Sequence, residues 1–425
     1  MKPTLPLLVF SLAGATLFAA DFRAAAVKVD ITPQESKYLV GYAARKSTGV
    51  HDRIHHRVLA MDDGATQVFI ASSDFCLFSP GFYDEVAAEL HREMGIGPRQ
   101  FWWTLTHTHS APEVGQPDVY KMLLGRSDHE WDREYTAYVR KSLVDAVREA
   151  RGKFEPARLT AGVGKAMANI NRRARDPEGR ISLGLNPEGP VDRQIGLLRV
   201  ERADGSPIAI LANYAIHGTV LGPQNLLISG DCGGVVANYV EQKTGAVALF
   251  VNGAAGNIAP IYSVYPDPRA GHLSQFNVLL GDRILDANGA LGPAVPQVSL
   301  WAAEKIVESP LREGLTWPEN LPQFIRAAPA GPPLVRLPVR FLRINDTLVW
   351  GAPIEMFCDI AMQVRELSPF TRTFFFGYTN GWFGYLPTAK GFEEGGYEPR
   401  TSPFTARVER DLLDVVVPFI QGMPR

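Results

Sequence analysis

Cysteine is scarce in this 425-residue sequence, and basic charge is not in excess. The three cysteines, Cys76, Cys232 and Cys358, lie far apart without a CxxC pair, so at most one disulfide can form. Stability must then come from a hydrophobic core, in which we expect all three to be buried thiols. The net charge of −2 provides neither the basic surface that nucleic acid requires nor a polybasic patch for anionic lipid.

Long hydrophobic runs are also missing after the first twenty residues. Residues 1–20 combine Lys2, an apolar stretch and small residues, which is the pattern of a secretory signal peptide. We expect cleavage near Ala19 or Ala20, and the alternative is an uncleaved anchor. The sequence therefore predicts an exported protein, periplasmic or secreted, whose mature part is soluble.

Glycine and proline, by contrast, are plentiful, at 39 and 32 residues, and indicate many turns and long loops. Strand-like runs at 24–30, 57–61, 67–72 and 101–105 are interspersed with amphipathic stretches at 82–94 and 131–150. These patterns predict an α/β fold with a mixed β-sheet core flanked by helices. We expect the site to be built from loops at strand ends, as in other open α/β sheets.

The stretch 101–113, FWWTLTHTHSAPE, is the first candidate for chemistry. Its aromatic and β-branched run ends at Thr106, where polar residues begin. His107 and His109 are two apart, so both imidazoles would face the same side if strand geometry persists. A histidine pair can also be a hydrogen-bonded surface feature, and further ligands are needed to favour a metal.

Other strand ends supply such candidates. The apolar run 208–216 leads to His217, and the run 348–350 leads to Glu355, which we place at the start of a helix. Two histidines and a carboxylate are a common catalytic Zn²⁺ set that leaves a position open for water. The alternatives are a core histidine at 217 and a carboxylate favoured by a helix dipole at 355. The tyrosine-rich loop 378–397 adds Tyr385, which could also be an ordinary packed aromatic.

The sequence alone does not decide the roles of two further groups of residues. Arg172 and Arg173 could simply be solvated, or one of them could hold a substrate oxygen. No spacing rule connects three other histidines to a metal, and we place them at the surface or behind the site: His51, His55 and His56.

The ordered motifs of the sequence resemble those of the neutral/alkaline non-lysosomal ceramidase family. The resemblance runs from about residue 24 to the C-terminus. The early motifs are DITP, GYA and GVHDRI, at 30–33, 41–43 and 49–54. The later motifs are THTHSAPE (106–113), INRR (170–173), NYAIHGT (213–219), LISGDCGG (227–234), GNIAP (256–260), GAPIE (351–355), GYLPT (384–388) and YEP (397–399).

The resemblance implies a zinc-dependent amidohydrolase that hydrolyses the N-acyl amide bond of ceramide to sphingosine and a fatty acid. It implies one Zn²⁺ with four ligands, which are His107, His217, Glu355 and Tyr385. It also implies three residues that line the substrate amide, which are His109, Arg172 and Tyr397. Zinc would acidify its water to a pKa near ~7, His109 would move the proton, and the other two would donate to the oxyanion.

Two departures from the family bear on the substrate. Ala259 stands where the GNIAP-type motif of the family has a serine, and the sequence stops at Arg425, without the family's C-terminal immunoglobulin-like domain. We expect residues 21–425 to form a single ceramidase-like catalytic domain with a small-molecule or lipid substrate, no nucleic-acid partner and transient contact with a membrane surface. The oligomeric state is not determined by the sequence.

Two alternative functions follow from these departures. One is an exported zinc hydrolase of another N-acyl amide or of an ester, from an envelope or sugar-linked compound. The other is a noncatalytic lipid- or glycan-binding protein on the same scaffold. Retention of four metal ligands argues against the second alternative.

Overall fold

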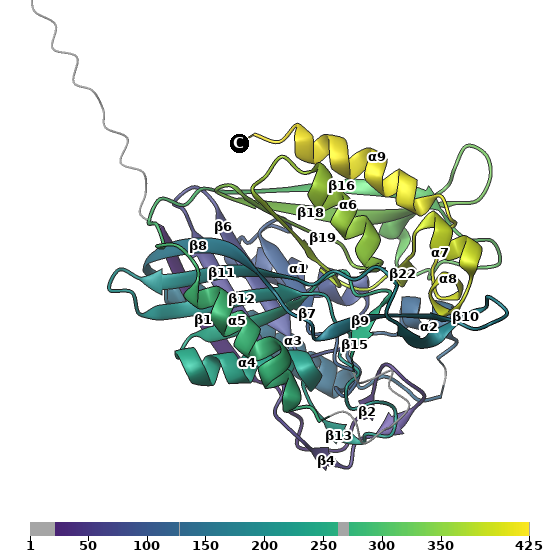
Figure 1. Cartoon of the computed structure of the whole chain (residues 1–425), viewed down its shortest axis with the longest axis horizontal. Helices are drawn as coiled ribbons and strands as arrows, with labels where there is room; N and C mark the ends of the chain where they lie inside the picture. Colours follow the sequence, from purple (N-terminus) through teal and green to yellow (C-terminus); the bar gives the residue numbers. More distant parts are fainter. Residues whose placement is uncertain (1–21, 127, 262–271, 425) are drawn as a thin grey trace, which may run out of the picture.

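Two β-sheets form the core of the computed structural model, which describes residues 22–126, 128–261 and 272–424 (Figure 1). The expected signal peptide, residues 1–20, lies outside the described residues. The larger sheet has eight strands in the order β14-β12-β11-β8-β1-β5-β6-β7. In that order they are Val247–Asn252, Pro207–Tyr214, Gln194–Arg202, Glu155–Lys165, Arg23–Asp30, His55–Asp62, Gln67–Ser73 and Phe101–Leu105.

The larger sheet is mixed, as predicted. Its two outermost pairs, β6 with β7 and β12 with β14, are parallel, and the other neighbouring strands are antiparallel. Along the chain, helix α1, Pro80–Met94, connects β6 to β7, and helix α4, Asp231–Thr244, occurs between β12 and β14. Proline at the start of α1 and left-handed Gly95 at its end explain where this helix begins and stops.

The second sheet packs face to face against the first. It contains β16 (Leu300–Pro310), β18 (Leu334–Ile344), β19 (Thr347–Gly351) and β21 (Arg372–Phe376), with the short β17 (Ile325–Arg326) on β18. Leu59, Ile70 and Trp102 of the first sheet share one buried cluster with Val349 and Phe374 of the second. Apolar side chains from both sheets therefore fill the space between them.

Helices cover the outer faces of this sandwich. Helix α3, Arg133–Gly152, lies on β1 and β5, while α6 (Cys358–Leu367) and α9 (Val408–Gln421) lie on the second sheet. The predicted α/β class is thus confirmed. Among the described residues, none of the helices combines the length and apolar character needed to cross a membrane, and the three cysteines are buried and unpaired, as expected.

Shorter elements connect these layers and carry much of the site. The short helices are α2 (Asp118–Leu124), η1 (Asn277–Gly281), α5 (Asp282–Gly289), η2 (Pro322–Phe324), α7 (Ala389–Glu394) and α8 (Tyr397–Arg400). The short strands are β2 (Tyr38–Leu39), β3 (Arg45–Lys46), β4 (Gly49–Val50), β9 (Asn169–Arg175), β10 (Ile181–Asn186), β13 (Leu227–Ile228), β15 (Ile258–Pro260), β20 (Glu355–Met356) and β22 (Tyr385–Leu386). Figure 1 shows β9, β10 and β22 close to α7 and α8.

Candidate metal centre

The ends of β7 and β12 bring the first two candidate ligands together. Thr108 and Gly218 form a parallel bridge, and the backbone N–H of His109 donates to the Gly218 carbonyl at 2.8 Å. A Cβ on Gly218 would lie 2.5 Å from the His107 carbonyl oxygen, so only glycine permits this approach. The two chain segments therefore place His107 beside His217, with ring centroids 4.5 Å apart.

The expected strand alternation does not explain how the histidine pair is arranged. Strand β7 ends at Leu105, and His107 has a left-handed backbone with φ 59°. That conformation is costly for a residue with a Cβ and is typical of functional sites. The Nε2 atoms of His107 and His109 nevertheless lie 3.3 Å apart, because the chain turns at His107 rather than continuing as a strand.

Glu355 completes a buried cluster with the two histidines. Its Oε2 lies 3.4 Å from His107 Nε2 and 3.2 Å from His217 Nε2. The prediction that Glu355 starts a helix is wrong, because it lies in β20 and α6 begins only at Cys358. A helix dipole therefore does not explain its position. Strand β20 pairs in parallel with β22, and this register places Tyr385 opposite Glu355.

The protonation of these groups suits a cation. His107 Nδ1 lies 2.7 Å from the Cys76 carbonyl, which can only accept, so Nδ1 carries the hydrogen and Nε2 presents a lone pair. Burial, reinforced by the Arg172 charge, lowers the pKa of His217 to about 3. Burial raises the pKa of Glu355, but His107 and His217 together hold it well below its usual range.

Three buried side chains thus bring electron-pair donors to short range of one another. Such an arrangement is costly unless a proton or a cation offsets the repulsion, and the Arg172 guanidinium, with Nη1 2.9 Å from His217 Nε2, supplies part of that positive charge. Ligands about 2.0–2.2 Å from a tetrahedral zinc lie about 3.3–3.6 Å apart, which agrees with the 3.2 and 3.4 Å separations at Glu355. The cluster of His107, His217 and Glu355 therefore fits a metal such as Zn²⁺.

Two aromatic residues that the sequence analysis missed hold the carboxylate. Trp382 Nε1 donates to Glu355 Oε1 at 2.7 Å, and the Tyr378 hydroxyl donates to Oε2 at 3.3 Å. The Tyr378 ring also stacks on His107, with centroids 4.1 Å apart. The only signal for them was their place in the aromatic-rich loop after β21. Partners of this kind orient a metal ligand and tune its affinity.

Arg172 lies against the cluster and is buried, so the solvated alternative is wrong. Its Nη1 lies 2.9 Å from His217 Nε2, and its Nη2 donates to the Tyr385 hydroxyl at 3.1 Å. The third nitrogen, Nε, donates to Glu398 Oε1 at 3.1 Å. Burial lowers the pKa of Arg172, but the Tyr385 and Glu398 side chains outweigh that effect and raise it.

His109 and Tyr397 are only partly buried and lie at the open side of the cluster. Burial, followed by the proximity of His107 and His217, lowers the pKa of His109 well below its usual value, and among the described residues its Nδ1 has no hydrogen-bond partner. The Tyr397 ring lies 5.6 Å from that of Tyr385. The structure thus brings all seven predicted site residues into one region, and their individual roles stay predictions.

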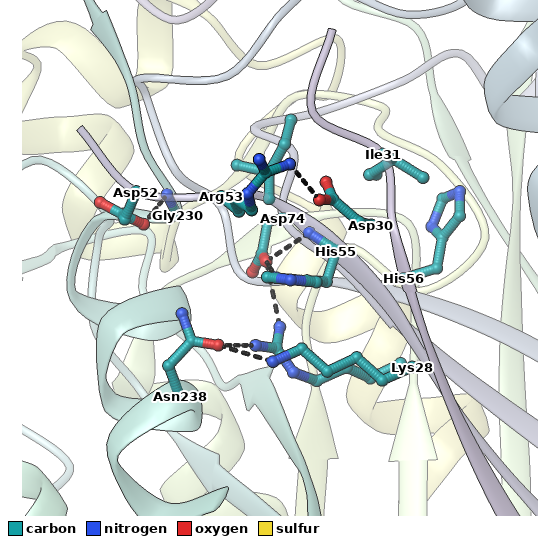
Figure 2. Close-up of polar contacts among 12 residues, drawn as sticks. Lys28, Asp30, Ile31, Asp52, Arg53, His55, His56, Asp74, Gly230 and Asn238 are labelled. Carbon is teal, nitrogen blue, oxygen red and sulfur yellow. Dashed lines mark hydrogen bonds and ion pairs between the residues drawn. The ribbon is translucent and has the colours of Figure 1, made fainter. Parts of the chain in front are cut away.

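The three histidines that no spacing rule connected to a metal lie in other surroundings. His51 is exposed, whereas His56 is buried beside the Ser73 hydroxyl, 2.6 Å from its Nδ1. Figure 2 shows His55 next to Asp74, whose Oδ2 accepts from the His55 backbone N–H at 2.9 Å. Asp74 also pairs with the buried Arg57 at 3.0 Å, within a polar cluster between the large sheet and α4. We assign this cluster a packing role.

The fold and the cluster of His107, His217 and Glu355 define an α/β protein with a buried histidine and carboxylate centre suited to a metal. The chain belongs to the neutral/alkaline non-lysosomal ceramidase family, because the model of that family's N-terminal part matches residues 22–262. This confirms the family resemblance of the motifs.

Curated relatives include neutral ceramidases of two organisms. The chain is 26% identical to the neutral ceramidase of Pseudomonas aeruginosa over 259 residues, which are 56% of this chain and 37% of the relative. It is also 26% identical to neutral ceramidase B of Dictyostelium discoideum over 262 residues, 54% of this chain and 34% of the relative. The matched part is thus about a third of each relative's length.

Solved structures share the fold across almost the whole chain. The crystal structure of neutral ceramidase from Pseudomonas aeruginosa aligns with a TM-score of 0.76 at 19% identity, covering 96% of this chain and 75% of that one. A structure described as ceramidase complexed with C2 aligns with a TM-score of 0.77 at 18% identity, covering 95% and 76%.

Proposed function

We propose that the chain is a zinc-dependent amidohydrolase that cleaves the N-acyl amide bond of ceramide to sphingosine and a fatty acid. Family membership supports the hydrolase class, and the names of the relatives support the substrate. The observation that carries the proposal is the convergence of His107 Nε2, His217 Nε2 and Glu355 Oε2 at the end of the sandwich.

Four residues would hold the metal in this proposal: His107, His217, Glu355 and Tyr385. Tyr385 lies opposite Glu355 in the β20–β22 pair, which supports its place in the ligand set. Zn²⁺ bound there would supply a Lewis acid and a water acidified to a pKa of about 7. Retention of all four groups makes a purely binding function less suitable for this chain.

His109 is suited to move the proton. Its lowered pKa keeps the imidazole neutral, and its Nε2 lies beside His107 Nε2 at the centre. It would accept a proton from the attacking water and deliver it to the amide nitrogen as the carbon–nitrogen bond breaks. The carbon–oxygen bond formed in this step leaves a fatty acid and a free amine.

Arg172 and Tyr397 are suited to stabilise the oxyanion. Arg172 stays protonated because the neighbouring Tyr385 and Glu398 favour its charge. Burial, followed by the Glu355 charge, raises the pKa of Tyr397 to about 12, so its hydroxyl remains a donor at neutral pH. Two such donors aimed at the developing negative charge are a large source of catalysis in acyl transfer.

A second candidate substrate is another N-acyl amide or an ester from an envelope or sugar-linked compound. The partly buried residues beside the cluster favour it, because Tyr42, His109 and Tyr397 each carry a polar group. The buried Ala259 in β15 also replaces the family's serine near Arg172. In either case we propose that the enzyme is exported and meets a lipid or small-molecule substrate in transient contact with a membrane surface.

The test combines elemental analysis with hydrolysis of a fluorescent short-chain ceramide, on the wild type, His107→Ala and the exposed His51→Ala as control. We expect one zinc per chain and turnover in the wild type and in the control, and loss of both in His107→Ala. Zinc without ceramide turnover would keep the hydrolase and favour the second substrate class. Absence of bound metal in the purified wild type would overturn the mechanism.

A further inference from the structure

Glu398 lies behind Arg172 on the side away from the candidate metal ligands. Its carboxylate is fully buried, and each oxygen accepts from a different arginine. Oε1 accepts from Arg172 Nε at 3.1 Å, and Oε2 accepts from Arg173 Nη1 at 2.6 Å. Arg172 and Arg173 are adjacent residues of β9, and Glu398 lies where both guanidinium groups reach it.

The contact with Glu398 determines how the Arg172 guanidinium is oriented. The other two nitrogens of Arg172 face His217 Nε2 at 2.9 Å and the Tyr385 hydroxyl at 3.1 Å. A planar guanidinium that is held at Nε cannot rotate without breaking that hydrogen bond. Glu398 also forms an ion pair with Arg172 at 3.1 Å, so it offsets a positive charge beside the proposed cation.

Glu398 also belongs to the element that carries Tyr397. Helix α8 begins at Tyr397, directly after Gly396, whose φ is 100°. The Arg173 guanidinium that pairs with Glu398 donates from Nη2 to the Gly395 carbonyl at 2.9 Å. The Glu398–Arg173 pair therefore fastens the start of α8 to β9, and with it the position of the Tyr397 ring.

We propose that Glu398 is a positioning residue, which aims Arg172 and Tyr397 at the substrate amide and balances the Arg172 charge beside the metal. Both effects rest on the proposed metal site, but only the effect on turnover rests on the proposed substrate. These two consequences can be measured separately in the full-length chain.

The first measurement is zinc affinity, by competition with a chromophoric chelator. We expect Glu398→Gln to weaken zinc binding by about 10- to 100-fold, as for other groups that support a metal ligand, because the Arg172 charge is no longer offset. In an Arg172→Met background the same change should cost nothing further, since the charge is absent. An equal loss in both backgrounds would overturn the proposal.

Glu394→Gln is the matched control. Glu394 also contacts Arg173, at 3.4 Å, and pairs with Arg175, but its described contacts do not include Arg172. We expect its zinc affinity and turnover to stay within twofold of the wild type. A loss as large as that of Glu398→Gln would show that the Arg173 side of the network is responsible and would overturn the proposal.

The second measurement is turnover with saturating zinc. We expect Glu398→Gln to lower kcat about 100-fold with little change in KM, because misaligned donors act mainly on the transition state. If Glu398→Gln does not fold, Glu398→Asp takes its place, since it keeps the charge but withdraws it by one methylene. If Glu398→Gln weakens zinc binding only when Arg172 is present, but the wild type does not hydrolyse ceramide, the positioning role is upheld and the proposed substrate is refuted. If the wild type hydrolyses ceramide but the effect of Glu398→Gln on zinc binding does not depend on Arg172, the substrate is upheld and the positioning role is refuted.

Discussion

The hydrogen bond from Trp382 to Glu355 allows a sharp test of the metal centre. Trp382→Phe keeps an aromatic ring but removes the indole N–H, which donates to Glu355 Oε1 at 2.7 Å. Both side chains are buried, so water cannot replace the donor. The carboxylate then loses one of the two aromatic donors that orient it, and Tyr378 alone remains.

The magnitude follows from the charge of the acceptor. A buried hydrogen bond to a charged group contributes about 1.5–3 kcal/mol. Loss of such a partner of a metal ligand should lower zinc affinity roughly 10- to 100-fold. The assay is chelator competition with the purified protein at fixed pH, with thermal unfolding recorded on the same samples.

Trp350→Phe is the matched control, because it makes the same chemical change elsewhere. Trp350 is fully buried in β19, and its Nε1 has no hydrogen-bond partner within the described part of the chain. We expect it to lower stability through lost packing and to leave zinc affinity unchanged. Equal zinc affinity in Trp382→Phe and the wild type, or an equal loss in both variants, would refute the reasoning.

Three further predictions concern stability and the open side of the centre. Burial lowers the pKa of His56 from 6.5 to about 4, so as the pH falls the unfolded chain takes up a proton on this histidine before the folded chain does. The free energy of unfolding should therefore fall by about 3 kcal/mol between pH 7 and pH 4, and it should fall less steeply with pH in His56→Asn. Gly41→Ala places a Cβ 2.4 Å from His109 Nδ1 and should lower turnover without releasing zinc, whereas Gly205→Ala, also at positive φ but in open space, should not. Removing the metal with a chelator should lower Tm, by the equivalent of about 2.7 kcal/mol if zinc was present at 100 times its Kd.

The main elements of the fold were open to prediction because their signals are local. Proline at residue 80 and glycine at residue 95 bound an amphipathic stretch, and α1 begins and ends there. The helix expected at 131–150 is α3, Arg133–Gly152, displaced by two residues because Asp132 provides its cap. Alternating runs of strand and helix also predicted the α/β class, which depends only on the order of elements.

The sequence predicted which residues form the candidate site, but it did not predict how they are arranged. Motif resemblance selected seven residues, and the structure brings them into one region. The strand-alternation argument for His107 and His109 required strand geometry to persist, and this condition is not met, because β7 ends at Leu105 and His107 is left-handed. The prediction that Glu355 starts a helix was also wrong. Glu355 lies in a strand because β20 pairs with β22, which is about thirty residues away in the sequence and could not be inferred from local signals.

The sequence by itself determined which elements form and which residue types stand at the strand ends, because capping, periodicity and apolar runs act over a few residues. Only the tertiary structure decided that Trp382 and Tyr378 donate to Glu355 and that Glu398 joins two arginines. These contacts depend on how distant loops close over the sandwich. Local spacing carries no information about that closure, and buried polar groups then take whichever partners the packing brings within reach.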